Sequence, residues 1–261
     1  MTNIPIFDSQ DVVLNHLLNH GFFDNKTKLC GGTSIARSYL NHRISYDLDF
    51  FLRDTFDPKD IAKKMQGMGL KATPFEWTNH HLKANQWHGG ITVPETDDII
   101  KVSFVEDEYF DVYPLVQTKI NQLNIPGEDI LGLYHRKLLT VSHTTETGLS
   151  ERGRQKARDL YDLWCLSQKI MPIADFVEKL PYTYNINSFL DGLDCMEWMD
   201  IIDEMDQIIP LGEYEKLTRD IGDIRRDLYL SAGVDISSEF DDDSDGQSTD
   251  KKSLSKNKTK S

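Results

Sequence analysis

Two aspartates lie two positions apart in an otherwise apolar run, Asp47-Leu-Asp49-Phe-Phe-Leu. Because successive side chains of a β-strand point to opposite faces, this spacing puts both carboxylates on one face of a predicted strand. Carboxylate oxygens are ligands that Mg2+ prefers, and the ion keeps its other positions for water and substrate phosphates. The pair is therefore a candidate magnesium site, although an Asp-x-Asp strand is also common as a solvated outer face.

A glycine pair precedes the aspartates by one short predicted helix. Gly31 and Gly32 allow a tight turn and a close approach of the backbone to a ligand. We expect Thr33 and Ser34 to cap a helix over residues 35–40, whose free N–H groups and positive dipole end suit a phosphate. A unit of strand, turn, helix and strand returns the aspartates to the glycine turn, so the two features together indicate transfer of a nucleotide.

A third block of charged residues lies on a helix predicted over about residues 153–168, which has one apolar side. Arg154, Arg158 and Asp162 are spaced to form a ladder of salt bridges on its exposed side. Asp159 lies one turn from Asp162. We expect Asp159 to take part in the chemistry and Asp162 to be structural, either orienting Arg158 or capping a buried donor.

These motifs resemble a known family. The run 31–51, Gly-Gly-Thr through His-Arg-x-Ser-x-Asp-Leu-Asp-Phe-Phe, resembles the first motif of the AbiEii/AbiGii (MenT-like) nucleotidyltransferase toxins of the DNA polymerase beta-like superfamily. Lys137 and the pair Arg158-Asp159 resemble the closing motifs of that family. The resemblance spans about residues 28–165, and it is specific because three motifs keep their order and separation.

The resemblance implies an α+β protein with a polymerase beta-like nucleotidyltransferase core and a helical C-terminal half. It implies that the strand aspartates hold Mg2+, or Mn2+ in its place, which bridges a nucleoside triphosphate, and that basic side chains neutralise charge as pyrophosphate leaves. The predicted catalytic residues are Asp47, Asp49, Lys137 and Asp159, the predicted metal ligands are Asp47 and Asp49, and the predicted nucleotide-binding residues are Gly31, Gly32, Thr33, Ser34, Arg43 and Arg158. Arg43 is expected to contact a phosphate or to fix Asp47.

One position departs from the superfamily pattern. In a strand predicted over residues 99–105, Lys101, Ser103 and Val105 share a face, and Ser103 stands where the superfamily usually carries a third carboxylate. A hydroxyl is a poorer Mg2+ ligand than a carboxylate. Either Asp159 completes the metal site from its helix, or the metal is held by two carboxylates and the nucleotide's own phosphates.

The acceptor is left open by the sequence. The resemblance implies transfer to the 3' end of a tRNA and a separate antitoxin that restrains the enzyme. A net charge of -14 favours a protein or small molecule as the acceptor, because an acidic chain binds nucleic acid poorly. The serine at position 103 supports another alternative, a non-catalytic nucleotide-binding interaction module. Locally, the segment 136–158 is basic enough for a triphosphate, whereas 175–209 is strongly acidic.

Composition sets broad limits on the remaining chain. No apolar stretch approaches the ~20 residues that span a bilayer, and the first residues lack a secretory signal, so we expect a cytoplasmic protein without a membrane partner. The three cysteines have no metal-type spacing and are expected to stay reduced. His80, His81 and His88 lack a completing set of ligands, so surface or strand positions are predicted for them.

Hydrophobic periodicity divides the chain into three predicted parts. Residues 1–126 mix strand and helix signals and should form the nucleotidyltransferase core. Residues 127–240 are helical and should complete the active site, and residues 241–261 should be a disordered tail because they offer almost nothing to bury. Strands are predicted near 71–77, 82–87 and 99–105, and helices near 11–20 and 58–68.

Overall fold

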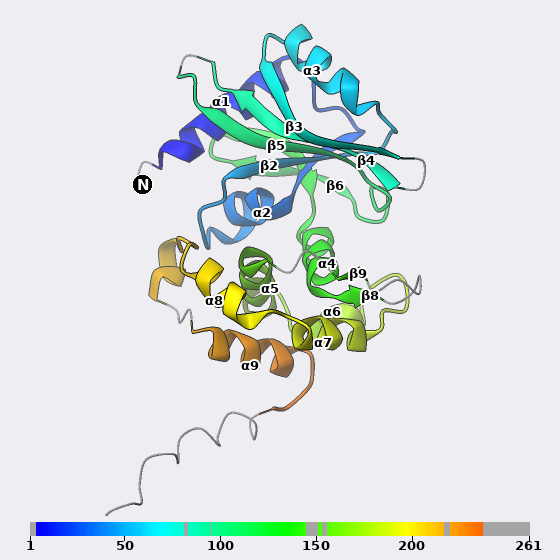
Figure 1. The fold of residues 1–261 in the computed structure, drawn as a ribbon, viewed down its shortest axis with the longest axis vertical. Helices are drawn as coiled ribbons and strands as arrows, with labels where there is room; N and C mark the ends of the chain where they lie inside the picture. Colours follow the sequence, from blue (N-terminus) through cyan, green and yellow to red (C-terminus); the bar gives the residue numbers. More distant parts are fainter. Residues whose placement is uncertain are drawn as a thin grey trace, which may run out of the picture.

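The computed structural model describes residues 4–80, 83–94, 96–144, 151–152, 156–216 and 220–236. A seven-stranded mixed sheet fills the upper half of Figure 1, and helices that follow it in sequence fill the lower half. Helices α1 (Pro5–Asn19) and α3 (Pro58–Gly67) pack on the face of the sheet that points away from the lower helices. This arrangement confirms the predicted α+β class.

The strand order of the sheet is β3-β4-β5-β2-β1-β7-β6. The pairs β2–β5 and β1–β7 are parallel, and the other neighbouring strands are antiparallel. The strands are β1 Thr27–Cys30, β2 Asp47–Leu52, β3 Lys71–His80, β4 Lys83–Thr92, β5 Ile99–Glu106, β6 Leu115–Ile120 and β7 Leu123–Glu128. The sequence did not predict β6 and β7, and β4 continues beyond its predicted end.

Alternation of side chains along β2 explains how the sheet presents two different faces. Leu48, Phe50 and Leu52 are buried between the sheet and the helices α1 and α3, where they join one apolar cluster. Asp47 and Asp49 lie on the opposite face, toward the lower helices. The predicted period of two is confirmed, and it places both carboxylates where the sheet meets the helical half.

The helical half packs around α5 (Ala157–Lys169), which is buried over almost its whole length. Leu138, Leu160 and Leu163 belong to its apolar cluster, which is separate from the one behind the sheet. The remaining elements are α2 Gly31–Ser34, the π-helix η1 Ile35–Leu40, α4 Ile130–Val141, the short strands β8 His143–Thr144 and β9 Glu151–Arg152, α6 Ile173–Val177, α7 Ile186–Asp194, α8 Trp198–Met205, the 3-10 helix η2 Gly212–Lys216 and α9 Ile221–Ser231.

Helix α5 differs from its prediction in two ways. Lys156 has extended backbone angles, so the helix begins at Ala157, about one turn later than predicted. Asp162 is fully buried, and the predicted exposed ladder of Arg158 and Asp162 is therefore wrong; Arg154 lies outside the described residues. Periodicity identified the most apolar side of this helix, but other elements surround it, so its polar side chains are buried as well.

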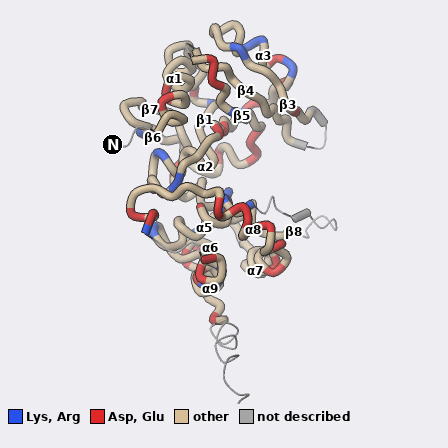
Figure 2. The backbone as a smooth tube through the Cα atoms, turned by 60° about the vertical axis from the view of Figure 1, so that its left-hand side comes forward, with Lys and Arg blue, Asp and Glu red and all other residues tan. Residues whose placement is uncertain are grey.

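Charge is spread unevenly over the fold. Asp and Glu gather on α7 and α8, within the acidic segment 175–209 (Figure 2). Across the described ranges, the helices lack the combination of length and apolar character that a bilayer span requires. The predicted division at residues 126 and 240 stays a prediction, and the predicted disordered tail, residues 241–261, lies outside the described residues.

Candidate active site

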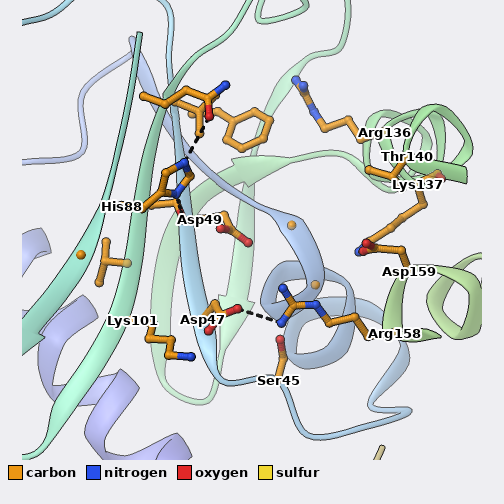
Figure 3. Close-up of a pocket in the computed structure, with 18 of the residues that line it drawn as sticks. Ser45, Asp47, Asp49, His88, Lys101, Arg136, Lys137, Thr140, Arg158 and Asp159 are labelled. Carbon is orange, nitrogen blue, oxygen red and sulfur yellow. Dashed lines mark hydrogen bonds and ion pairs between the residues drawn. The ribbon is translucent and has the colours of Figure 1, made fainter. Parts of the chain in front are cut away.

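A cavity of about 430 Å³ lies between the face of the sheet that carries the aspartates and the helices α4 and α5. Figure 3 shows side chains from both walls pointing into it. The predicted site residues that line it are Gly31, Gly32, Arg43, Asp47, Asp49, Lys137, Arg158 and Asp159. The structure thus brings together residues that lie far apart in the sequence, and of the predicted set only Thr33 and Ser34 are not among the lining residues.

The glycine turn lies directly against the second aspartate. Strands β1 and β2 pair so that Cys30 is opposite Asp49, and Gly31 follows with a φ of +70°. A Cβ atom at Gly31 would lie 2.2 Å from Oδ2 of Asp49, which is far inside contact distance. Both the backbone angle and the close approach therefore require glycine, and they keep the backbone of the turn beside the carboxylate.

The expected capping of the next helix by Thr33 and Ser34 is wrong. The helical segment begins already at Gly31, and neither α2 nor η1 has a side-chain cap. Thr33 is buried and its hydroxyl donates to the backbone carbonyl of Asp47, while Ser34 is buried without a hydrogen-bond partner among the described residues. The part of the turn that reaches the cavity is the glycine pair, and Thr33 ties it to β2.

Asp162 is the centre of a buried charge cluster on the helix side of the cavity. Its Oδ1 accepts from Nε2 of His42 at 2.7 Å and from Nε of Arg43 at 2.5 Å, and its Oδ2 accepts from Nη2 of Arg43 at 2.8 Å. Nζ of Lys137 lies 2.8 Å from Oδ2 of Asp162 and 2.5 Å from Oδ1 of Asp159. We call these five residues the helix-wall cluster.

Asp162 of the helix-wall cluster stays ionised at neutral pH. Burial by itself would raise the pKa of Asp162, but the charges of Arg43 and Lys137, with hydrogen bonds from Arg43 and His42, hold it well below its usual range. Burial lowers the pKa of His42, so this imidazole is neutral and donates its Nε2 hydrogen to Asp162. Two cations are therefore matched by two carboxylates, Asp159 and Asp162.

The two arginines predicted to bind the nucleotide, Arg43 and Arg158, pair with different aspartates. Arg43 does not fix Asp47: its guanidinium is bound to both oxygens of Asp162, and a Cβ at Gly32 would lie 2.4 Å from it. Arg158 contacts Asp47 instead, with its Nη1 2.9 Å from Oδ2 of Asp47. Because Arg158 is partly exposed and reaches the cavity from α5, it can exchange this carboxylate for a phosphate.

The two aspartates of β2 fit a magnesium site that depends on the substrate. Both line the cavity from one face of the strand, and Gly31 leaves room for the oxygens of Asp49. In the described ranges, no group of three or more Asp, Glu, His or Cys side chains converges to hold a metal alone. Asp159 is bound by Lys137. The donor set therefore suits Mg2+ held by two carboxylates and substrate phosphates.

Ser103 lies beside Asp49, as the predicted face of β5 requires. The strands pair in register, with Lys101 next to Asp47 and Ser103 next to Asp49. His88 of β4 follows in the same row and hydrogen-bonds to Ser103. His88 is thus on a strand, as predicted, but its position in the cavity was missed, because cross-strand neighbours are set by the register and not by spacing along the chain.

Arg136 belongs to a second buried cluster behind the cavity. Its guanidinium binds both Glu128 and Asp107, and Nζ of Lys28 lies 2.6 Å from Oε1 of Glu128. Burial would raise the pKa of Glu128, but Arg136 and Lys28 lower it. We call Lys28, Asp107, Glu128 and Arg136 the Glu128 cluster; it joins β1, β7 and α4.

The sequence matches a family model described as Nucleotidyl transferase AbiEii toxin, Type IV TA system, over residues 12–185. The chain belongs to this family. The matched region covers more than half of the chain and contains both walls of the cavity. This AbiEii family member is thereby a nucleotidyltransferase of the toxin type, and a toxin–antitoxin system implies a nucleotide substrate and an antitoxin partner.

Solved structures share the fold of this AbiEii protein. MenT4, a nucleotidyltransferase toxin from Mycobacterium tuberculosis H37Rv, aligns with a TM-score of 0.52 and 18% identity over 90% of this chain and 85% of that one. A protein from H. pylori that is assigned as a nucleotidyltransferase aligns with a TM-score of 0.51 and 15% identity over 87% and 92%. At these identities the likeness shows the fold alone. No curated protein matches the sequence.

Proposed function

We propose that this chain is a Mg2+-dependent enzyme that transfers a nucleotide from a nucleoside triphosphate to the 3' end of a tRNA, and that a cognate antitoxin restrains it in the cytoplasm. The observation that carries the proposal is the single cavity shared by the β2 aspartates, the glycine turn and Lys137, in a chain of a nucleotidyltransferase toxin family. The tRNA follows only from the family resemblance.

Each wall of the cavity has its own task in the proposed reaction. Asp47 and Asp49 would hold the metal, which supplies charge neutralisation of the triphosphate when it is bound. The backbone at Gly31 and Gly32 approaches the phosphates, and Arg158 leaves Asp47 to bind one of them.

The helix wall offers two cationic groups in fixed positions, each paired with a carboxylate. Lys137 holds an ammonium group near the bond to the leaving pyrophosphate, and Asp159 and Asp162 keep that group in place through ion pairs of 2.5 and 2.8 Å. Arg43 adds a second cation whose planar group is locked by Asp162. Because these groups are ordered before substrate binds, they stabilise developing charge without the cost of reorganisation.

A labelling experiment tests the proposed function. The purified chain is incubated separately with each labelled nucleoside triphosphate, Mg2+ and either total RNA or total cell protein. We expect label in tRNA, removable by a 3' exonuclease and abolished by EDTA. Label in protein would replace the tRNA by a protein acceptor, which the net charge of -14 favours. Nucleotide binding without transfer to any acceptor would leave the interaction-module alternative and refute the enzyme.

A further inference from the structure

Three polar side chains form a hydrogen-bonded row across the sheet wall of the cavity. Oγ of Ser103 lies 2.9 Å from Nδ1 of His88, and Nε2 of His88 lies 3.1 Å from Oε1 of Gln86. All three line the cavity, and Figure 3 shows the imidazole with a dashed contact on either side. The row begins beside Asp49, whose register partner on β5 is Ser103, at the strand spacing of about 4.8 Å.

The partners of the imidazole define where its hydrogen lies. An amide oxygen only accepts, so Nε2 of His88 carries the hydrogen that faces Oε1 of Gln86. Nδ1 then has a free lone pair and accepts from the hydroxyl of Ser103. The hydroxyl of Ser103 thus points its proton at a base, and its own lone pairs are left to accept from a hydroxyl group in the cavity.

We propose that Ser103 and His88 form a proton relay for the acceptor hydroxyl, in the place of a third carboxylate. This inference rests on the proposed nucleotide transfer. As the acceptor oxygen bonds to the α-phosphorus and the bond from that phosphorus to pyrophosphate breaks, the acceptor's proton passes to Oγ of Ser103 and the proton of Ser103 passes to Nδ1 of His88. Ser103 contacts the acceptor, and His88 acts through it as a positioning residue that holds the proton.

Charged groups lie on the strands on either side of His88. On β3 its register partner is Glu76, and on β5 Lys101 lies two residues before Ser103. The other titratable or charged groups that line the cavity are Asp47, Asp49, Arg136, Lys137, Arg158 and Asp159. The row predicts that transfer fails once the imidazole is protonated, because an imidazolium can no longer accept from Ser103.

Three variants test the relay through the pH dependence of single-turnover transfer. His88→Ala should lower the rate at neutral pH by about 10²-fold, the scale expected when a general base is lost. It should also remove the fall in rate at acidic pH, which is the acidic limb of the pH profile. Gln86→Glu should move the acidic limb to higher pH, because the added carboxylate stabilises the imidazolium. His20→Ala, which removes an exposed histidine on the turn after α1, is the matched control and should keep both the rate and the limb.

Rescue separates a relay from a structural role. In the His88→Ala background, Ser103→Asp places a carboxylate where it takes the proton directly, and we expect it to restore transfer at least tenfold. If the wild type is active but the fall in rate at acidic pH persists in His88→Ala, the relay is refuted and the proposed function stands. The relay is likewise refuted if Ser103→Asp does not restore transfer in the His88→Ala background. A wild type that transfers no nucleotide overturns the proposed function together with the relay. If His88→Ala does not fold, the shift of the limb in Gln86→Glu decides.

Discussion

The two walls of the cavity hold their carboxylates in different ways. On the sheet wall, Asp47 and Asp49 are partly exposed and stand on an alternating strand. On the helix wall, Asp159 and Asp162 are fully buried and bound to buried cations, whereas Arg158, which pairs with Asp47, is partly exposed. Because partly exposed carboxylates remain accessible to a ligand and buried ones are committed to their partners, the difference separates groups that would bind substrate from groups that order the site.

The Glu128 cluster shows that burial of charge alone does not mark a catalytic group. Like the helix-wall cluster, it balances two cations against two carboxylates. It reaches the cavity only through Arg136, whereas Arg43, Lys137 and Asp159 of the helix-wall cluster all line the cavity. Adjacent residues of α4, Arg136 and Lys137, therefore serve two clusters, one that joins elements of the fold and one that faces the substrate.

The largest effect is expected on the sheet wall. Asp47→Ala or Asp49→Ala should lower transfer by about 10³-fold, which is ~4 kcal/mol at ~1.36 kcal/mol per tenfold, because each removes a ligand for the metal. Thermal stability should change little, since neither carboxylate is buried in an apolar core. Asp111→Ala, at an exposed aspartate paired with Arg53 outside the cavity, is the control and should stay fully active. Near-normal turnover by a folded Asp49→Ala protein would refute the proposed metal site.

At Asp162 of the helix wall the main effect should be on stability. Asp162→Asn leaves Arg43 and Lys137 buried without their shared carboxylate, and we expect the free energy of unfolding, measured with urea, to fall by about 3–5 kcal/mol. Because the pKa of Asp162 is lowered in the folded protein, its contribution is complete above about pH 4, the range of an unfolded aspartate, and is lost as the pH falls through the lower folded value. A variant as stable as the wild type at pH 7 would contradict the buried ion pairs.

The helix-wall and Glu128 clusters can be compared through neighbouring positions of α4. Lys137→Ala should lower transfer per folded molecule by about 10²-fold, the scale of one preorganised electrostatic contact. Arg136→Ala should mainly lower stability, because it leaves Glu128 and Asp107 with Lys28 as their remaining partner in the cluster. Transfer rates and urea unfolding are measured on both proteins under the same conditions. Equal activity of the two folded variants would mean that Lys137 does not act on the substrate.

The sheet wall could be predicted because its geometry follows from local rules. The period of two along β2 fixed the face of Asp47 and Asp49, and the same rule put Lys101 and Ser103 on one face of β5. Glycine at position 31 indicated a close approach of the backbone, and the structure shows that the approach is to Asp49. These conclusions needed only spacing along one segment and one short connection.

The family resemblance placed Lys137, Arg158 and Asp159 in the site, but the ion pairs of the helix wall could not be predicted because they come from packing between distant segments. Whether Arg43 or Arg158 binds Asp47 depends on how α5 is rotated against the turn before β2, and spacing within either segment does not contain that rotation. Strand β7 was missed for a local reason. It carries Pro126 and Gly127, which usually end strands, yet Gly127 leaves room for the side chain of Thr118 on β6.

The smallest effect is expected far from both walls and provides the baseline for the other variants. Deleting residues 241–261 should leave the melting temperature and the rate of transfer almost unchanged, because Leu254 is the only large apolar residue that this segment has to bury. The deletion also removes the run Asp241-Asp242-Asp243 and the lysines that follow it, so transfer is measured at low and at physiological salt. A marked loss of stability would show that the segment docks on the body of the protein. A change in transfer that is seen at low salt but not at physiological salt would show that the charges of this segment act on the acceptor. The segment would then contribute to substrate binding together with the two walls of the cavity.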